Sequence, residues 1–277
     1  MIQFKHTVFA LPFALMSLMT ASGESWPQGR TWLWVIVAMV GARTSAMAFN
    51  RLIDQNIDAL NPRTKSRSLP AGRLSRFFVV AVIVITSVVF IIAASQLNRL
   101  CLVLSGPTLA ILLGYSYAKR FTPLAHLWLG IALGIAPIGA WIAVEGELAW
   151  PPLVLGMAVA LWVAGFDTIY SLQDEVFDRD QGLRSIPARF GAQKALLIAR
   201  FFHFLASCGF AAFAIAAGGG WLRALAVLIA IGLLVKQHSM ISAENLDRVD
   251  AAFFSINGIL AILMLSLFTF AKILSGS

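Results

Sequence analysis

The sequence predicts an all-α, polytopic membrane protein: a bundle of nine transmembrane helices with cytoplasmic cap loops. Hydrophobic residues occupy 59% of the 277 positions and charged residues only 12%, and the mean hydropathy is +0.83. Soluble proteins carry about 25% charged residues, so this composition excludes an ordinary soluble globular chain. Only helices and closed barrels satisfy their backbone polar groups inside lipid, and long apolar runs without strict alternation favour helices.

Apolar stretches of about 20 residues, the length needed to cross roughly 30 Å of hydrocarbon, recur along the chain. The expected spans are 7–23, 32–53, 77–96, 100–118, 124–144, 152–174, 195–217, 221–237 and 251–272. The first resembles a signal peptide, but it contains Pro12 and has no clear small-residue cleavage site. We therefore expect it to be retained as a helix.

The net charge of +8 is distributed unevenly over the connections between spans. Most basic residues lie before the first span or on the second-to-third, fourth-to-fifth, sixth-to-seventh and eighth-to-ninth connections, whereas the alternate connections carry few. Because short cytoplasmic loops are enriched in Lys and Arg, the pattern places the N-terminus and the basic loops in the cytoplasm. An odd number of spans then leaves the C-terminus outside. This distribution indicates membrane topology rather than nucleic-acid binding.

Two acidic motifs interrupt the apolar sequence, each at the junction of a span and a basic loop. In the first, Asn50, Asp54 and Asp58 fall at i, i+4 and i+8, which predicts one stripe rising about 12 Å along a helix. An acidic residue costs about 2.5–3.5 kcal/mol at the centre of a lipid span, so such a cluster indicates a functional site.

The second motif is expected to form a similar stripe, with members at i, i+3, i+7 and i+11. These are Asp167, Tyr170, Asp174 and Asp178. If the two helices face each other, the acids meet in a pocket at the cytoplasmic edge of the bundle. We therefore treat residues 1–277 as a single domain with pseudo-repeated motifs at 50–58 and 167–178, because either motif alone would leave its charges half neutralised.

The residue types in these motifs favour a hard cation. Carboxylate and amide oxygens, without sulfur or histidine, suit Mg²⁺ or Ca²⁺ and disfavour zinc. Because Mg²⁺ usually completes its coordination with water and substrate phosphate, the motifs suggest a site for a diphosphate bridged by Mg²⁺. The candidate counter-charges for the diphosphate oxygens are Arg43, Arg51, Arg63, Lys119 and Arg120.

The two motifs, their place after the second and sixth of nine spans, and the Tyr115–Arg120 stretch together resemble the UbiA superfamily of intramembrane prenyltransferases. The resemblance implies a UbiA-like helical bundle over nearly the whole chain. It also implies that Asn50, Asp54 and Asp58 hold Mg²⁺ on the diphosphate of a polyprenyl donor, and that Asp174 and Asp178 do so from the other side. Asp167 belongs to the second motif as a further candidate metal ligand. Tyr115 and Tyr170 are implied in substrate binding.

Such a site would ionise the allylic C–O bond of the donor. Its catalytic carboxylates would be Asp54, Asp58, Asp174 and Asp178. An electron-rich aromatic ring would then attack the resulting cation. The stretches at 5–13 and 165–174 are similar to the 4-hydroxybenzoate polyprenyltransferase branch of the superfamily. That similarity implies transfer to 4-hydroxybenzoate in ubiquinone biosynthesis, in the bacterial inner membrane. Prenylation of a dihydroxynaphthoate in menaquinone biosynthesis is the alternative reaction, because both acceptors carry a phenol and a carboxylate.

A transporter with repeated halves is the competing class, since such proteins also carry intramembrane acids. Transport sites usually lie near the bilayer midplane on broken helices, whereas these acids cluster at one membrane face beside basic loops. Arg67 and Arg184 are expected to tie their loops to the acids. The histidines show no ligand spacing and are expected to pack in the core or at interfaces; they are His6, His126, His203 and His238.

Overall fold

The computed structural model describes residues 9–246 and 248–275, and within these residues it is helical with connecting loops and no strand. A helix lies at each of the nine predicted spans. They are α1 (Leu11–Ala21), α2 (Gly29–Ile53), α4 (Arg76–Leu97), α5 (Arg99–Phe121), α6 (Ala125–Glu145), α7 (Trp150–Tyr170), α10 (Ala192–Ala216), α11 (Trp221–Ser239) and α13 (Asn257–Ser275). Shorter elements are α3 (Gln55–Leu60), η2 (Ser171–Asp174), α8 (Glu175–Asp180), α9 (Ile186–Phe190), α12 (Val249–Ala251) and η3 (Ala252–Ile256).

Among the described residues, eight helical stretches are long and apolar enough to cross a membrane. The predicted all-α bundle is therefore confirmed. Helix α1 has 11 residues, and the expected start of its span at residue 7 lies outside the described residues, as do Lys5 and His6.

The chain divides into two compact units. One contains Gln28–Ala118, and the other contains the described residues of Lys5–Pro27 and Lys119–Ser277. Each unit carries one of the two acidic motifs, so each motif has its own local scaffold.

In the first unit, α2 and α4 pack closely through small residues. A Cβ added at Gly41 would lie 2.9 Å from the carbonyl oxygen of Thr86, so glycine lets the two backbones approach. Beside it, the hydroxyls of Ser45 and Ser87 lie 2.7 Å apart and hydrogen bond across the interface. The pair thereby holds the end of α2, where the first motif lies, at a fixed position within the unit.

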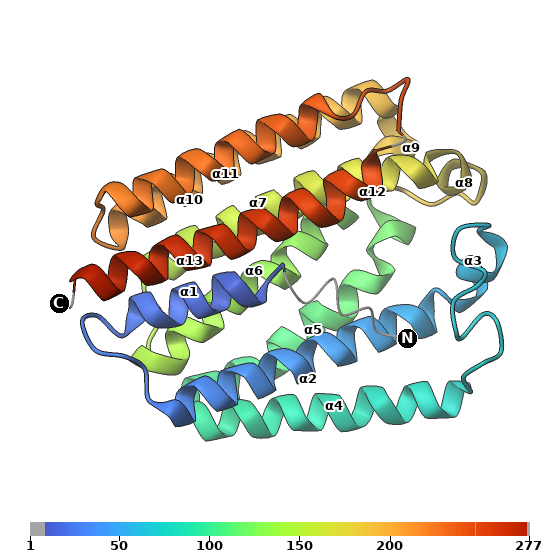
Figure 1. The fold of residues 1–277 in the computed structure, drawn as a ribbon. Coiled ribbons are helices and arrows are strands. Elements are labelled where there is room, and N and C mark those ends of the chain that lie inside the picture. The colour runs from blue at the N-terminus through green and yellow to red at the C-terminus, as the bar shows by residue number, and fades with distance from the viewer. Residues whose placement is uncertain (1–8, 247, 276–277) are drawn as a thin grey trace. The chain divides into compact units, whose positions relative to one another are not determined.

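The core of the second unit surrounds α7, the helix labelled α7 in Figure 1. Most residues of this helix are buried. Trp162 is fully buried at its centre, packs at a tilt against Phe13 and edge to face against Phe166, and donates its Nε1–H to Asn257 Oδ1 over 3.0 Å. Helices α6 and α10 pack on α7, and α11 packs on α13. This packing makes α7, which carries Asp167, the best-supported helix of the unit.

Helices α6 and α7 approach unusually closely. A Cβ at Gly130 would lie 2.0 Å from the carbonyl oxygen of Ala160, and one at Gly134 would lie 2.3 Å from that of Gly156. Both distances are shorter than any Cβ contact allows. The interface therefore depends on glycine at one-turn spacing, as is typical of tightly packed membrane helices.

Lys272, a buried cation on the apolar helix α13, is held by hydrogen bonds to the end of α1. Its Nζ donates to the carbonyl oxygens of Met19 and Gly23 over 2.7 and 2.6 Å, and to Ser22 Oγ over 3.0 Å. These groups lie at the C-terminal end of α1, where backbone carbonyls lack helical partners. The lysine of α13 therefore caps α1 and joins the two helices.

Candidate active site

The first acidic motif lies where α2 ends. Backbone hydrogen bonds continue through it, from Asp54 N to Asn50 O over 2.9 Å and from Asp58 N to Asp54 O over 2.7 Å. However, Asp54 itself leaves the helical conformation (φ −89°, ψ 4°), and α3 begins after it. The prediction of one regular helical stripe was therefore wrong. The side chain of Asn50 donates to Asp54 Oδ2 over 3.0 Å, and Asn and Asp side chains of this kind compete with regular helix.

Asp54 and Asp58 of this motif are both buried, each only 4% exposed. Arg67 Nη1 donates to Asp58 Oδ1 over 2.7 Å, and Arg51 Nη1 lies 3.8 Å from Asp58 Oδ2. No described residue hydrogen bonds to Oδ2. A buried carboxylate oxygen that accepts no hydrogen bond, with only a guanidinium at ion-pair distance, is suited to accept a further cation.

The loop that follows folds back on the motif. Thr64 Oγ1 donates to the carbonyl oxygen of Asp58 over 3.0 Å, and Arg63 N–H donates to Asn61 Oδ1 over 2.9 Å. Together with the Arg67 contact, these bonds confirm that Arg67 ties its loop to an acid of the motif.

We expect the substitution Arg67→Met to loosen this loop, because it removes the hydrogen bond to a buried carboxylate. Amide hydrogen exchange over residues 59–74 should become faster by about tenfold. The matched control is Arg76→Met, since Arg76 is exposed at the start of α4. Equal exchange in both variants would show that the ion pair does not hold the loop.

The remaining candidates of the first unit lie near the motif on α2 and α5. Arg43 is half-buried on α2, and Tyr115 of α5 lies within electrostatic range of its guanidinium. Later along the same two helices, the rings of Phe49 and Tyr117 meet edge to face, with their centroids 5.9 Å apart. Arg51 is half-buried and Arg63 is exposed. The unit thus gathers basic and aromatic side chains around its acids.

The second acidic motif also departs from a regular helix. Asp167 and Tyr170 lie on α7, but the chain then tightens into the 3₁₀ helix η2, which ends at Asp174, and Asp178 follows on α8. Because a 3₁₀ helix has 3.0 residues per turn rather than 3.6, the predicted single stripe was wrong here too. Two side-chain hydroxyls donate hydrogen bonds to the preceding turn. Thr168 Oγ1 donates to the carbonyl oxygen of Ala164 over 2.7 Å, and Ser171 Oγ donates to that of Thr168 over 2.8 Å. Such bonds bend helices.

Asp178 is buried, whereas Asp174, Asp167 and Tyr170 are half-buried. The ring of Tyr170 lies 4.2 Å from that of Phe253, centroid to centroid. Lys119 and Arg120, at the end of α5, are also half-buried, and the backbone oxygen of Lys119 accepts from Arg184 N over 2.7 Å. The predicted site residues of this unit therefore lie at the ends of α5 and α7 and on the short helices η2 and α8.

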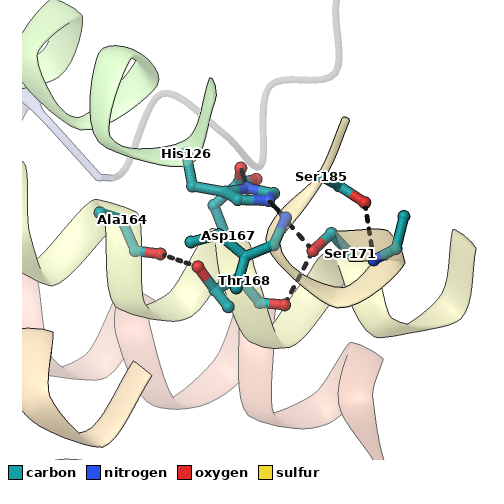
Figure 2. A network of polar contacts seen from close by, with 8 residues as sticks. His126, Ala164, Asp167, Thr168, Ser171 and Ser185 are labelled. Atoms are coloured by element: carbon teal, nitrogen blue, oxygen red, sulfur yellow. Dashed lines mark hydrogen bonds and ion pairs between the residues drawn. The ribbon is translucent and has the colours of Figure 1, made fainter. Parts of the chain in front are cut away.

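His126 contacts the second motif directly, which sequence reasoning missed (Figure 2). Its Nδ1 lies 2.7 Å from Asp167 Oδ2, and its Nε2 lies 3.3 Å from the backbone nitrogen of Ile186. Ser171 Oγ is 3.5 Å from Nε2. The expectation that His126 serves packing alone was therefore wrong. No spacing rule links it to Asp167, because the two residues are 41 positions apart. His203, by contrast, is buried and pairs with His238 at 2.9 Å, as expected of a packed histidine.

Arg184 holds the loop after the motif, but not through an acid. Its Nη1 donates to the carbonyl oxygen of Phe121 over 2.8 Å, and its backbone N–H donates to Lys119. The expected tie from Arg184 to the acids was thus wrong. The loop is anchored to the end of α5 by uncharged carbonyl oxygens instead.

Within the described residues, no three side chains of His, Cys, Asp or Glu lie close enough to hold a metal by themselves. Mg²⁺ needs no such cage, since it is commonly bound by one or two carboxylates together with substrate phosphates. The oxygen ligands of each motif and the hydrogen-bond-free Oδ2 of Asp58 fit that mode of binding.

Comparison with known proteins identifies the family. The model of the UbiA prenyltransferase family matches residues 10–259. A 4-hydroxybenzoate octaprenyltransferase of Methylobacillus flagellatus is 32% identical over 170 residues, which cover 61% of this chain and 57% of the relative. The alignment therefore spans little more than half of that relative's length.

Solved structures agree with this match. The apo structure of a UbiA homolog from Aeropyrum pernix K1 is 35% identical, with a TM-score of 0.87 and 99% of both chains covered. A UbiA homolog from Archaeoglobus fulgidus, solved with GPP and Mg²⁺, is 17% identical, with a TM-score of 0.75 and coverage of 96% of this chain and 95% of the homolog. The latter likeness shows the fold alone. The chain is a multi-pass membrane protein that belongs to the UbiA prenyltransferase family.

Proposed function

We propose that this protein is a Mg²⁺-dependent aromatic polyprenyltransferase. It transfers a polyprenyl group from its diphosphate to an aromatic hydroxy acid, namely 4-hydroxybenzoate for ubiquinone biosynthesis. The observation that carries the proposal is the pair of acidic motifs at helix ends, one in each unit, in a chain of this family. An apolar chain would not retain two such motifs without a ligand for them.

The carboxylates divide into two sets of ligands. Asn50, Asp54 and Asp58 would hold one Mg²⁺, and the second set is Asp167, Asp174 and Asp178. When bound, the metal would neutralise charge on the leaving diphosphate and so favour cleavage of the allylic C–O bond. Oxygen-only ligands support Mg²⁺ over softer ions.

Basic side chains would stabilise the diphosphate as its charge develops. Arg51 lies beside Asp58, and Arg43 lies about two turns earlier on α2, so both would combine with the first motif. Lys119, Arg120 and Arg63 complete the set of proposed phosphate contacts. Guanidinium groups suit this role because they bind phosphate oxygens in a bidentate manner.

Aromatic side chains would shield the allylic cation from water. Tyr170 packs against Phe253 and Phe254, with centroid distances of 4.2 and 6.3 Å. Such faces attract cations electrostatically. Tyr115, beside Arg43, would contribute similarly in the first unit. The basic connections would lie on the cytoplasmic side of the bacterial inner membrane, with the C-terminus outside and all 277 residues acting as one domain.

The reaction can be tested with membranes that contain the protein and a labelled polyprenyl diphosphate. 4-Hydroxybenzoate and a dihydroxynaphthoate are offered in parallel. We expect labelled prenyl-4-hydroxybenzoate. A labelled naphthoate product instead would move the protein to menaquinone biosynthesis, and no product with either acceptor would reject the proposed function.

Removal of divalent ions is expected to stop the reaction. Excess chelator should reduce product formation at least about 100-fold, because the diphosphate would leave without charge neutralisation. Added Mg²⁺ should restore turnover, whereas Ca²⁺, which prefers more ligands at longer distances, should restore less. Full activity in excess chelator would contradict the metal-dependent mechanism.

A further inference from the structure

His126 connects three separate segments of the second unit. It lies at the start of α6 and is only 5% exposed. Its imidazole contacts Asp167 on α7 (Figure 2). It also contacts the backbone of Ile186 at the start of α9. The side chain thus joins the helix that carries the second motif to the loop that follows it.

The hydrogen-bond partners determine which nitrogen carries the proton. The backbone N–H of Ile186 can only donate, so Nε2 must be the acceptor. Nδ1 then carries the hydrogen and donates it to Asp167 Oδ2, 2.7 Å away. The neutral Nδ1–H tautomer therefore satisfies both contacts at once.

This arrangement engages one carboxylate oxygen of Asp167 and leaves the other available to a ligand. Oδ2 is held by His126, whereas Oδ1 takes no hydrogen bond from any described residue. The Asp167 side chain is 23% exposed, so this oxygen is accessible. A carboxylate with one oxygen oriented and the other accessible is the usual state of a metal ligand that is fixed by an outer-shell donor.

The loop does not need the imidazole for its anchorage. Leu183 N–H donates to Asp178 O over 2.8 Å, and the two bonds of Arg184 fix the loop to the end of α5. Ser185 Oγ caps α9 by accepting from Ala188 N–H. Ser185 also hydrogen bonds to the side chain of Asp178. His126 adds to these contacts a link between the loop and Asp167.

We propose that His126 is a positioning residue of the site: it orients Asp167 so that Oδ1 binds the divalent cation that accompanies the prenyl diphosphate, and it couples this orientation to the Ser185–Ile186 loop. The inference rests on the proposed function for the identity of the ligand. It goes beyond that function because it assigns a role to a residue outside both acidic motifs.

Two substitutions separate the two contacts of the ring. The amide nitrogen of Asn reaches the position of Nδ1, so His126→Asn keeps the donor to Asp167. The amide of Gln reaches the position of Nε2, so His126→Gln keeps only the acceptor for Ile186. A role through Asp167 predicts rescue by Asn and failure of Gln, whereas a role in holding the loop predicts the reverse.

The primary measurement is equilibrium binding of Mn²⁺ in the presence of geranyl diphosphate, followed by electron paramagnetic resonance on the purified full chain. His126→Gln should weaken binding by about tenfold or more, the range typical of outer-shell partners, and His126→Asn should stay within about threefold of the wild type. Asp167→Asn should match His126→Gln, and the double substitution should add nothing further. His203→Gln is the control for loss of a buried imidazole and should leave Mn²⁺ binding unchanged.

Equal losses in the Asn and Gln variants, or additive losses in the double variant, would overturn the positioning role. Failure of the wild-type protein to bind Mn²⁺ in the presence of geranyl diphosphate would also overturn it. Because binding is measured without turnover, a wild type that binds both but forms no prenylated product would reject the proposed function separately. In that case the comparison of Asn with Gln still decides the role of His126.

Discussion

Substitution of Asp174 by asparagine is expected to abolish prenyl transfer while the protein still inserts and folds. Asparagine keeps the size of the side chain but removes the charge that would hold a divalent ion on the leaving diphosphate. The effect on kcat/KM should be at least about 100-fold, as is typical when a main electrostatic group of a transition state is lost. Asp54→Asn should behave in the same way from the first motif.

The neighbouring Glu175 provides a matched control for Asp174. It pairs with Arg179 at 2.5 Å on α8, so its charge is already used within the helix. Glu175→Gln should therefore retain most of the wild-type turnover, measured with labelled polyprenyl diphosphate and 4-hydroxybenzoate. Normal turnover by a well-folded Asp174→Asn variant would remove Asp174 from the catalytic carboxylates.

Substitution of Gly130 by alanine is expected to have the largest effect on stability. The added Cβ would lie 2.0 Å from the carbonyl oxygen of Ala160, which belongs to the backbone of α7 and cannot rotate away. Helices α6 and α7 would have to separate, at a cost of roughly 3 kcal/mol or more, the upper end of the usual range for overpacking. The melting temperature in detergent and the yield of folded protein should both fall.

Gly139 of the same helix is the control for this effect. A Cβ at Gly139 meets no atom within 4 Å, so Gly139→Ala adds the same methyl group to α6 without a clash. Its melting temperature should equal or slightly exceed that of the wild type, since alanine favours helix. Equal stability of the Gly130 and Gly139 variants would show that the close approach of α6 and α7 is not needed.

The positions of the helices could be predicted from the sequence because a bilayer imposes a length on every apolar segment. The span expected at 77–96 corresponds to α4, Arg76–Leu97, and that at 124–144 corresponds to α6, Ala125–Glu145. Acidic groups are costly inside the hydrocarbon, so their clustering next to apolar segments allowed the two acidic motifs to be recognised as candidate sites.

The local shape of the motifs could not be predicted, because it depends on side chains that compete with the helical backbone. Spacing rules assume a regular helix, yet the chain departs from it at Asp54 and again at Ser171. At both places an Asn, Ser or Thr side chain forms a bond with a neighbouring turn or side chain. Such bonds are possible at many positions, and the sequence does not say which ones form.

The sequence by itself determined the class of protein, the positions and order of its apolar helices and the two acidic motifs, since these follow from local composition and the thickness of a membrane. Tertiary structure alone decided that His126 meets Asp167, that Arg184 binds a carbonyl oxygen rather than an acid, and that Gly130 touches the backbone of α7. These contacts join residues that are distant along the chain. They depend on how the helices pack, and periodicity within one helix carries no information about a partner on another.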